Sequence, residues 1–228
     1  MGTMDPQAFL REMEAGSALE RALRWEEAAA HYGRLVDHLR SVGGDEGVAR
    51  MQRARAALRH GSALMELSRW EEARTALDGG IEDAKASGNG EALAQALLAG
   101  GVYAMNRADF PRAEAFLMEA LDRFHRSDDP ASLAGRGWTF LNLALLYGKT
   151  GRLDLAFVTL TKAQDVLGAA EDWGGVAAAW EAQAQLRRAI GDEDRWREDL
   201  AEAVVFYDRE GMDAKATRLR GLLGRKVV

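Results

Sequence analysis

The sequence predicts an all-α fold, a solenoid of about five helical hairpins closed by one further helix, with residues 1–228 forming a single domain. Only three of the 228 residues are proline, while Ala, Leu, Glu and Arg, which favour helices, dominate. Gly, Asn, Asp and Pro interrupt the chain at intervals of roughly forty residues, a period typical of stacked supersecondary units. Between these breaks lie paired helix-length segments with apolar periodicity, joined by short polar hinges.

The hinges share a register. RWEEA occurs at both 24–28 and 69–73, and DFPRA at 109–113 and RLDLA at 152–156 resemble it. We call the last residue of each hinge the anchor, with a fifth anchor at Trp196. The anchors are Ala28, Ala73, Ala113, Ala156 and Trp196. Twelve residues before them stand Gly16, Gly61, Gly101, Ala144 and Ala184, and four after them stand Tyr32, Leu77, Leu117, Leu160 and Leu200. Small residues allow two helices to approach closely while large residues one turn away fill the space, so the register predicts the contact inside each hairpin.

The elements follow in chain order. We expect hairpins at about 5–42, 46–87, 90–127, 130–168 and 173–210. Ser68 with Glu71 predicts a capping box at the second helix of the second hairpin, and Asp109 with Pro111 predicts the same boundary in the third. Asp129 before Pro130 predicts the start of the fourth hairpin.

A last amphipathic segment, 213–226, is expected to cap the exposed end of the array, as open solenoids require. An alternative is that its basic residues form a patch for nucleic acid or membrane. These residues are Lys215, Arg218, Arg220, Arg225 and Lys226.

The segment FLNLALLYGKTGRLDLAFVTLTKA, Phe140–Ala163, and Trp180 of the fifth hairpin resemble the tetratricopeptide repeat (TPR) family. The resemblance covers about residues 7–210. The usual repeat has 34 residues, and the longer period here is similar to that of TPR-like arrays in bacterial regulatory proteins. The resemblance implies a right-handed solenoid whose first helices line a concave groove, and a protein–protein interaction module without catalytic activity.

The resemblance also implies which residues face the groove. Trp138 and Met105 are the expected anchoring side chains for an amphipathic helix or extended peptide. The alternative for Leu98, Val102, Leu141 and Leu145 is that they belong to the core. The predicted groove residues are Arg55, Arg59, Met65, Leu98, Val102, Met105, Asn106, Trp138, Leu141, Asn142 and Leu145.

The sequence contains few motifs that would indicate catalysis or metal binding. The chain has no cysteine, which excludes disulfides, a cysteine nucleophile and thiolate metal sites. Glu27 and His31 share a helix face, but a zinc or iron site needs three or four converging ligands. GGDEG at 43–47 is similar to the GGDEF signature of cyclic-dinucleotide synthases, yet it lies between helical patterns and is interpreted as a turn. No phosphate loop or nucleophile elbow occurs, so we expect no enzyme, cofactor or metal.

Charge and hydropathy limit the cellular location and the classes of partner that we expect. The longest uncharged stretch, Ala92–Asn106, is too short and too polar to span a bilayer, and no secretory signal is recognised at the N-terminus. A formal net charge of −6 argues weakly against nucleic-acid binding. We expect a cytoplasmic, bacterial protein that binds a protein or peptide and does not bind nucleic acid or membrane directly. Alternatives are a self-associating scaffold, such as a homodimer, or the sensor part of a bacterial signalling or transcription system.

Overall fold

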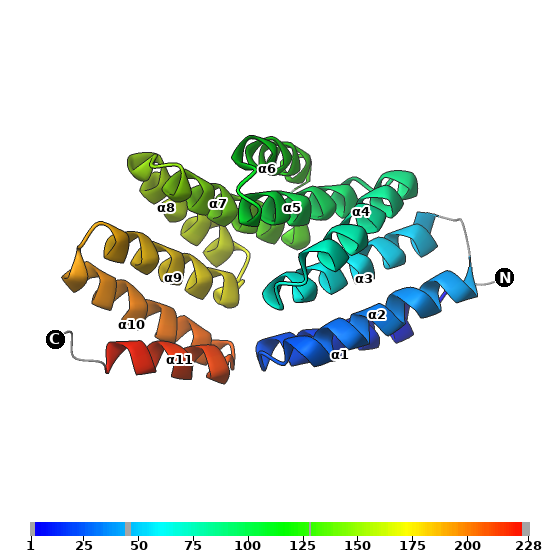
Figure 1. The fold of residues 1–228 in the computed structure, drawn as a ribbon, viewed down its shortest axis with the longest axis horizontal. Helices are drawn as coiled ribbons and strands as arrows, with labels where there is room; N and C mark the ends of the chain where they lie inside the picture. Colours follow the sequence, from blue (N-terminus) through cyan, green and yellow to red (C-terminus); the bar gives the residue numbers. More distant parts are fainter. Residues whose placement is uncertain (1–2, 44–46, 128, 225–228) are drawn as a thin grey trace. The chain divides into compact units, whose positions relative to one another are not determined.

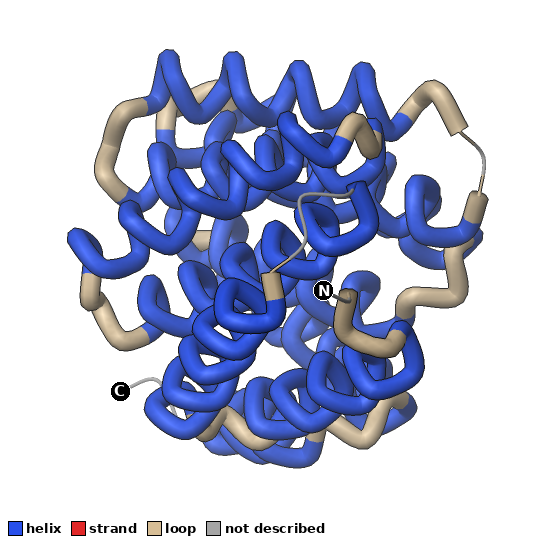
Figure 2. Tube along the Cα trace, turned by 90° about the vertical axis from the view of Figure 1, so that its right-hand side faces the viewer, coloured by secondary structure: helices blue, strands red, loops and turns tan. Residues whose placement is uncertain are grey.

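The regular secondary structure is entirely α-helical in the computed structural model, which describes residues 3–43, 47–127 and 129–224 (Figures 1 and 2). This confirms the predicted fold class. The eleven helices of these residues are α1 (Pro6–Arg21), α2 (Trp25–Val42), α3 (Gly47–Glu66), α4 (Trp70–Ser87), α5 (Gly90–Asn106), α6 (Phe110–Phe124), α7 (Pro130–Lys149), α8 (Leu153–Ala169), α9 (Trp173–Ala189), α10 (Glu193–Arg209) and α11 (Asp213–Leu223).

The chain divides into two compact units, an N-terminal unit, Met1–Ala120, and a C-terminal unit, Leu121–Val228. In the N-terminal unit each of α1 to α4 packs on the helix that follows it, and α3 also contacts α1 and α5. In the C-terminal unit each of α7 to α10 packs on its successor, and α7 also contacts α9. Consecutive helices therefore form hairpins, and the first helices of neighbouring hairpins lie side by side within each unit.

The predicted register describes the core. All five anchors are buried, with Ala28, Ala73, Ala113 and Ala156 completely so. A Cβ atom added to Gly61 would lie 2.7 Å from Cγ of Leu77, and one added to Gly101 would lie 2.8 Å from Cγ of Leu117. The small residue of the first helix therefore receives the large side chain of the second, which confirms the packing reason for the register.

The turns within the hairpins share one backbone feature. The residue five positions before each anchor is left-handed, with φ values of 57° at Leu23, 58° at Ser68, 60° at Ala108, 77° at Gly151 and 79° at Gly191. A left-handed residue ends a helix because it turns the following N–H groups back toward the last carbonyl groups of that helix.

This geometry shows that the predicted capping box at Ser68 is wrong. The N–H of Ser68 bonds to the carbonyl oxygen of Met65, and the N–H of Arg69 bonds to that of Leu64, each at 2.9 Å. Ser68 therefore closes α3 instead of opening α4. The N-cap of α4 is Arg69, whose side chain makes no capping hydrogen bond and instead binds Glu72.

The other two predicted helix starts are confirmed. The carboxylate of Asp109 accepts a hydrogen bond from the N–H of Arg112 at 3.3 Å, at the start of α6. Asp129 is the N-cap of α7 and accepts from the N–H of Ser132 at 3.0 Å, with Pro130 as the first helical residue. Hydrogen bonds from Ser127 and Ser132 hold the pKa of Asp129 well below its usual range.

Helix α11 covers the last hairpin. Ala216 and Leu219 are buried, whereas Asp213, Thr217, Arg218 and Arg220 are exposed. Its basic side chains contact the same unit: Arg218 pairs with Glu181, Arg220 pairs with Asp208, and the ammonium group of Lys215 lies over the ring of Tyr207. These contacts favour the capping interpretation. Residues 225 and 226 of the predicted segment lie outside the described residues.

Residues 44–46 of the GGDEG segment, which is interpreted as a turn, fall outside the described part of the chain. Gly43 ends α2 with a φ of 78°, and Gly47 begins α3. Among the described residues, no helix is long and apolar enough to cross a membrane.

Candidate functional site

The first candidate surface lies on the first helices of the N-terminal unit, where α3 sits against both α1 and α5. Arg55 of α3 places Nη2 3.0 Å from Oε1 of Glu91 in α5, and Nε2 of Gln95 donates to the same oxygen at 2.8 Å. Arg59 forms an ion pair with Glu20 of α1. The two predicted arginines therefore tie α3 to its neighbours on both sides, and their charges are already paired.

The remaining predicted residues of this unit differ in exposure. Met65 and Met105 are buried, at 8% and 5% exposed, so they pack within the unit and offer little surface to a partner. Leu98 and Val102 are half-buried on α5, and Val102 packs against the core of the unit. Asn106 is exposed at the end of α5. The surface open to a partner is thus formed by Leu98, Val102 and Asn106 of α5.

The second candidate surface lies on α7 of the C-terminal unit, at Trp138. The indole Nε1 of Trp138 donates to Oδ2 of Asp172 at 2.7 Å, and Oδ1 of Asp172 caps α9 by accepting from the N–H of Gly175 at 2.8 Å. The amide group of Asn142 donates to the backbone oxygen of Trp138 at 2.8 Å. The polar edge of the indole is therefore used inside the unit, and the half-buried ring remains as an apolar surface.

The other two predicted residues of α7 differ from each other in exposure. Leu141 is 4% exposed and belongs to the core, whereas Leu145 is half-buried, one helical turn further along. We therefore define the C-terminal candidate surface as Trp138, Asn142 and Leu145.

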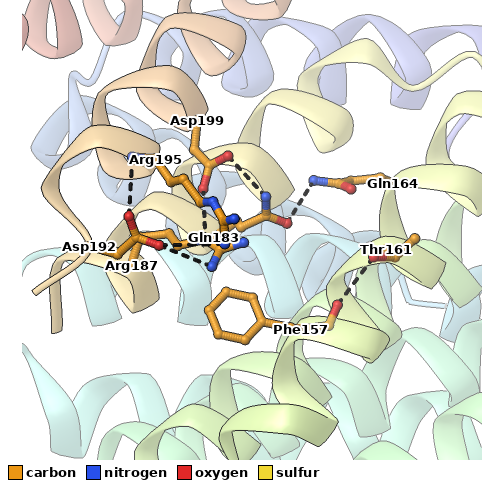
Figure 3. Close-up of polar contacts among 8 residues, drawn as sticks. All are labelled: Phe157, Thr161, Gln164, Gln183, Arg187, Asp192, Arg195 and Asp199. Carbon is orange, nitrogen blue, oxygen red and sulfur yellow. Dashed lines mark hydrogen bonds and ion pairs between the residues drawn. The ribbon is translucent and has the colours of Figure 1, made fainter. Parts of the chain in front are cut away.

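A partly buried polar network in the C-terminal unit was missed by the sequence analysis (Figure 3). Gln164 of α8 lies 3.4 Å from Gln183 of α9, which donates to Oδ1 of Asp199 in α10 at 2.9 Å. Arg187 of α9 lies between two carboxylates, 3.3 Å from Asp192 and 3.8 Å from Asp199. The network joins three consecutive helices.

Burial affects one carboxyl group of this network. Asp199 is only 6% exposed, and this burial raises the pKa of its carboxyl group. The guanidinium group of Arg187 lies 4.5 Å from the centre of the Phe157 ring, on the α8 side of the network (Figure 3). Glutamine and aspartate on amphipathic helices usually face solvent, so nothing in the sequence indicated that these residues meet.

The contacts of Glu27 and His31 do not support a shared role as metal ligands. Glu27 bonds to Arg24, whereas Nε2 of His31 lies 2.8 Å from the backbone oxygen of Glu12. Within residues 3–43, 47–127 and 129–224, no three His, Asp or Glu side chains gather in a way that could hold a metal ion.

Comparisons with known proteins show likeness in structure. No protein-family model and no curated protein sequence matches the chain. The crystal structure of BtubC (BKLC) from P. vanneervenii matches with a TM-score of 0.61 at 13% identity, over 90% of this chain and 94% of that one. A crystal structure of Podosopora anserina putative kinesin light chain nearly identical TPR-like repeats matches with a TM-score of 0.56 at 13% identity, over 91% of this chain and 99% of that one. The chain therefore has a TPR-like repeat fold.

Proposed function

With the TPR-like repeat fold as the premise, we propose that this protein is a non-catalytic interaction module that binds a peptide or partner protein on its first helices. The observation that carries the proposal is the surface of α5, where half-buried Leu98 and Val102 lead to exposed Asn106. Apolar side chains provide the desolvated contact, and an amide group provides the orienting hydrogen bonds. The setting we propose is the bacterial cytoplasm.

The chemistry of the surface favours a partner with an apolar face and few charges. Arg55 and Arg59 already contact Glu91 and Glu20, so an acidic partner would have to compete with these ion pairs. A segment with two or three apolar side chains on one face can instead lie along Leu98 and Val102 without breaking them. The C-terminal surface offers a second apolar contact at Trp138 and Leu145, beside Asn142, whose amide group also donates to the backbone oxygen of Trp138.

Site-specific photo-crosslinking tests the proposal. A photoreactive phenylalanine analogue replaces Leu98, and in a matched control it replaces Thr75, which is exposed on the second helix α4. We expect a cross-linked partner at position 98 and none at position 75. Cross-linking at position 75 alone would place binding on the second helices and overturn the proposal.

Binding of the identified partner then measures the contribution of the surface. Truncating a contact residue, Leu98→Ala, is expected to weaken binding by about 1–2 kcal/mol, roughly a tenfold rise in Kd. Thr75→Ala should leave Kd unchanged. Circular dichroism of each variant checks that the helices persist, so that lost binding is not confused with unfolding.

A further inference from the structure

At two outward positions of its register, α8 carries large apolar side chains where the other second helices do not. Leu155 and Val158 are 45% and 56% exposed. They stand one residue before and two residues after the anchor Ala156. In the other hairpins these two positions are also exposed, and they hold charged, small or hydroxyl side chains. Those residues are Glu27 and Ala30, Glu72 and Thr75, Arg112 and Ala115, and Arg195 and Glu198.

Charges of opposite sign flank the apolar pair. Asp154 lies four residues before Val158 and Lys162 four residues after it, and both are exposed. Residues four apart share one helix face, so Asp154, Val158 and Lys162 form a single row. Neither Asp154 nor Lys162 forms an ion pair within the part of the chain that the structure describes.

We infer that α8 docks against α8 of a second copy of this chain, in an antiparallel pair with its two-fold axis near Val158. The symmetry places Asp154 opposite Lys162 of the second copy, and Lys162 opposite Asp154 of that copy. Two ion pairs then flank an apolar contact made by Leu155 and Val158 of both chains. A two-fold interface requires a self-complementary surface, and this row of residues has that property.

The charge pattern also fixes the orientation of the pair. A parallel arrangement would place Asp154 against Asp154 and Lys162 against Lys162, and like charges in contact oppose association. One helix face is small for an interface, so we expect a weak dimer with a Kd in the micromolar range. The inference does not depend on the proposed function, because it uses a second helix and leaves the first helices open.

Sedimentation velocity of the full chain at about 5 to about 500 μM tests the pairing. The wild-type protein should pass from monomer to dimer across this range. Val158→Glu should remain monomeric throughout, because it places two carboxylates at the symmetry axis. Ala115→Glu is the matched control, since Ala115 holds the same exposed position in α6, and it should dimerise like the wild type.

Charge reversal tests the antiparallel geometry. Asp154→Lys alone and Lys162→Asp alone should each weaken dimerisation by roughly tenfold or more, because each creates two like-charge contacts. An equimolar mixture of the two variants should form a heterodimer, since both contacts are then attractive. Circular dichroism confirms that every variant is helical. A wild-type monomer at all concentrations, a dimer that survives Val158→Glu, or a mixture without rescue would each overturn the inference.

Discussion

Replacing Gly101 by alanine should destabilise the protein, although alanine is the better helix former. Within α5, alanine gains about 1 kcal/mol of helix propensity over glycine. The new Cβ atom would lie 2.8 Å from both Cγ and Cδ2 of Leu117 and 3.4 Å from the backbone oxygen of Ala113. Carbon atoms in favourable contact are about 3.5–4.0 Å apart, so Leu117 must move by roughly 1 Å.

The energetic cost of moving Leu117 decides whether Gly101→Ala lowers or raises the stability of the protein. Leu117 is completely buried, so its side chain has no solvent to move into. Overpacking of this kind costs about 1–3 kcal/mol, which leaves a net loss of stability of about 0–2 kcal/mol after the gain in propensity. The urea midpoint, followed by the helical circular dichroism signal, measures this difference.

Gly79 provides the control. It lies inside α4, and the nearest atom to an added Cβ is Nη2 of Arg40 at 3.8 Å. Gly79→Ala should therefore stabilise the protein by about 1 kcal/mol. In a Leu117→Ala background, Gly101→Ala should also become stabilising, because the clash is gone. If Gly101→Ala raised the midpoint as much as Gly79→Ala and did so equally in both backgrounds, the packing explanation of the register would be refuted.

Three further predictions concern a turn, a cap and the polar network around Asp199. Ala108→Gly should stabilise the protein by about 1 kcal/mol in urea denaturation, because it relieves a left-handed alanine, whereas Gly151→Ala should destabilise it by a similar amount. Asp172→Ala should cost about 1–3 kcal/mol in the same assay, since it removes the N-cap of α9 and the acceptor for the Trp138 indole; an unchanged midpoint would contradict both roles. Burial raises the pKa of Asp199 in the folded state, so the free energy of unfolding should decline as pH rises above the ordinary Asp value of about 4 and through the raised pKa. Asp199→Asn should flatten this decline in urea titrations at several pH values, and an unchanged slope would assign it to other groups.

The candidate site was only partly predictable from the sequence. The resemblance to TPR repeats placed Leu98, Val102 and Asn106 on α5, where the structure leaves them at least partly exposed. It could not separate these from Met105, which lies on the same helix and is buried. Exposure at one turn of a helix depends on how closely the neighbouring helices approach, and a repeat register does not specify that distance.

The polar contacts between helices could be identified only from the tertiary structure. Trp138 bonds to Asp172, and Arg59 pairs with Glu20, across separations in the chain that no local pattern relates. The link between Gln183 and Asp199 likewise joins two helices whose polar residues would each be expected to face water.

The sequence by itself determined the helices, the hairpin register and most of the helix ends, because these depend on short-range spacing and on local backbone chemistry. Alanine anchors, small residues twelve positions earlier and proline after aspartate are all visible in the chain. Only the tertiary structure decided that Ser68 closes α3, which groove residues are buried, and how the polar side chains pair. Those outcomes depend on distances between helices that are remote in the sequence, and side-chain burial and pairing follow from these distances.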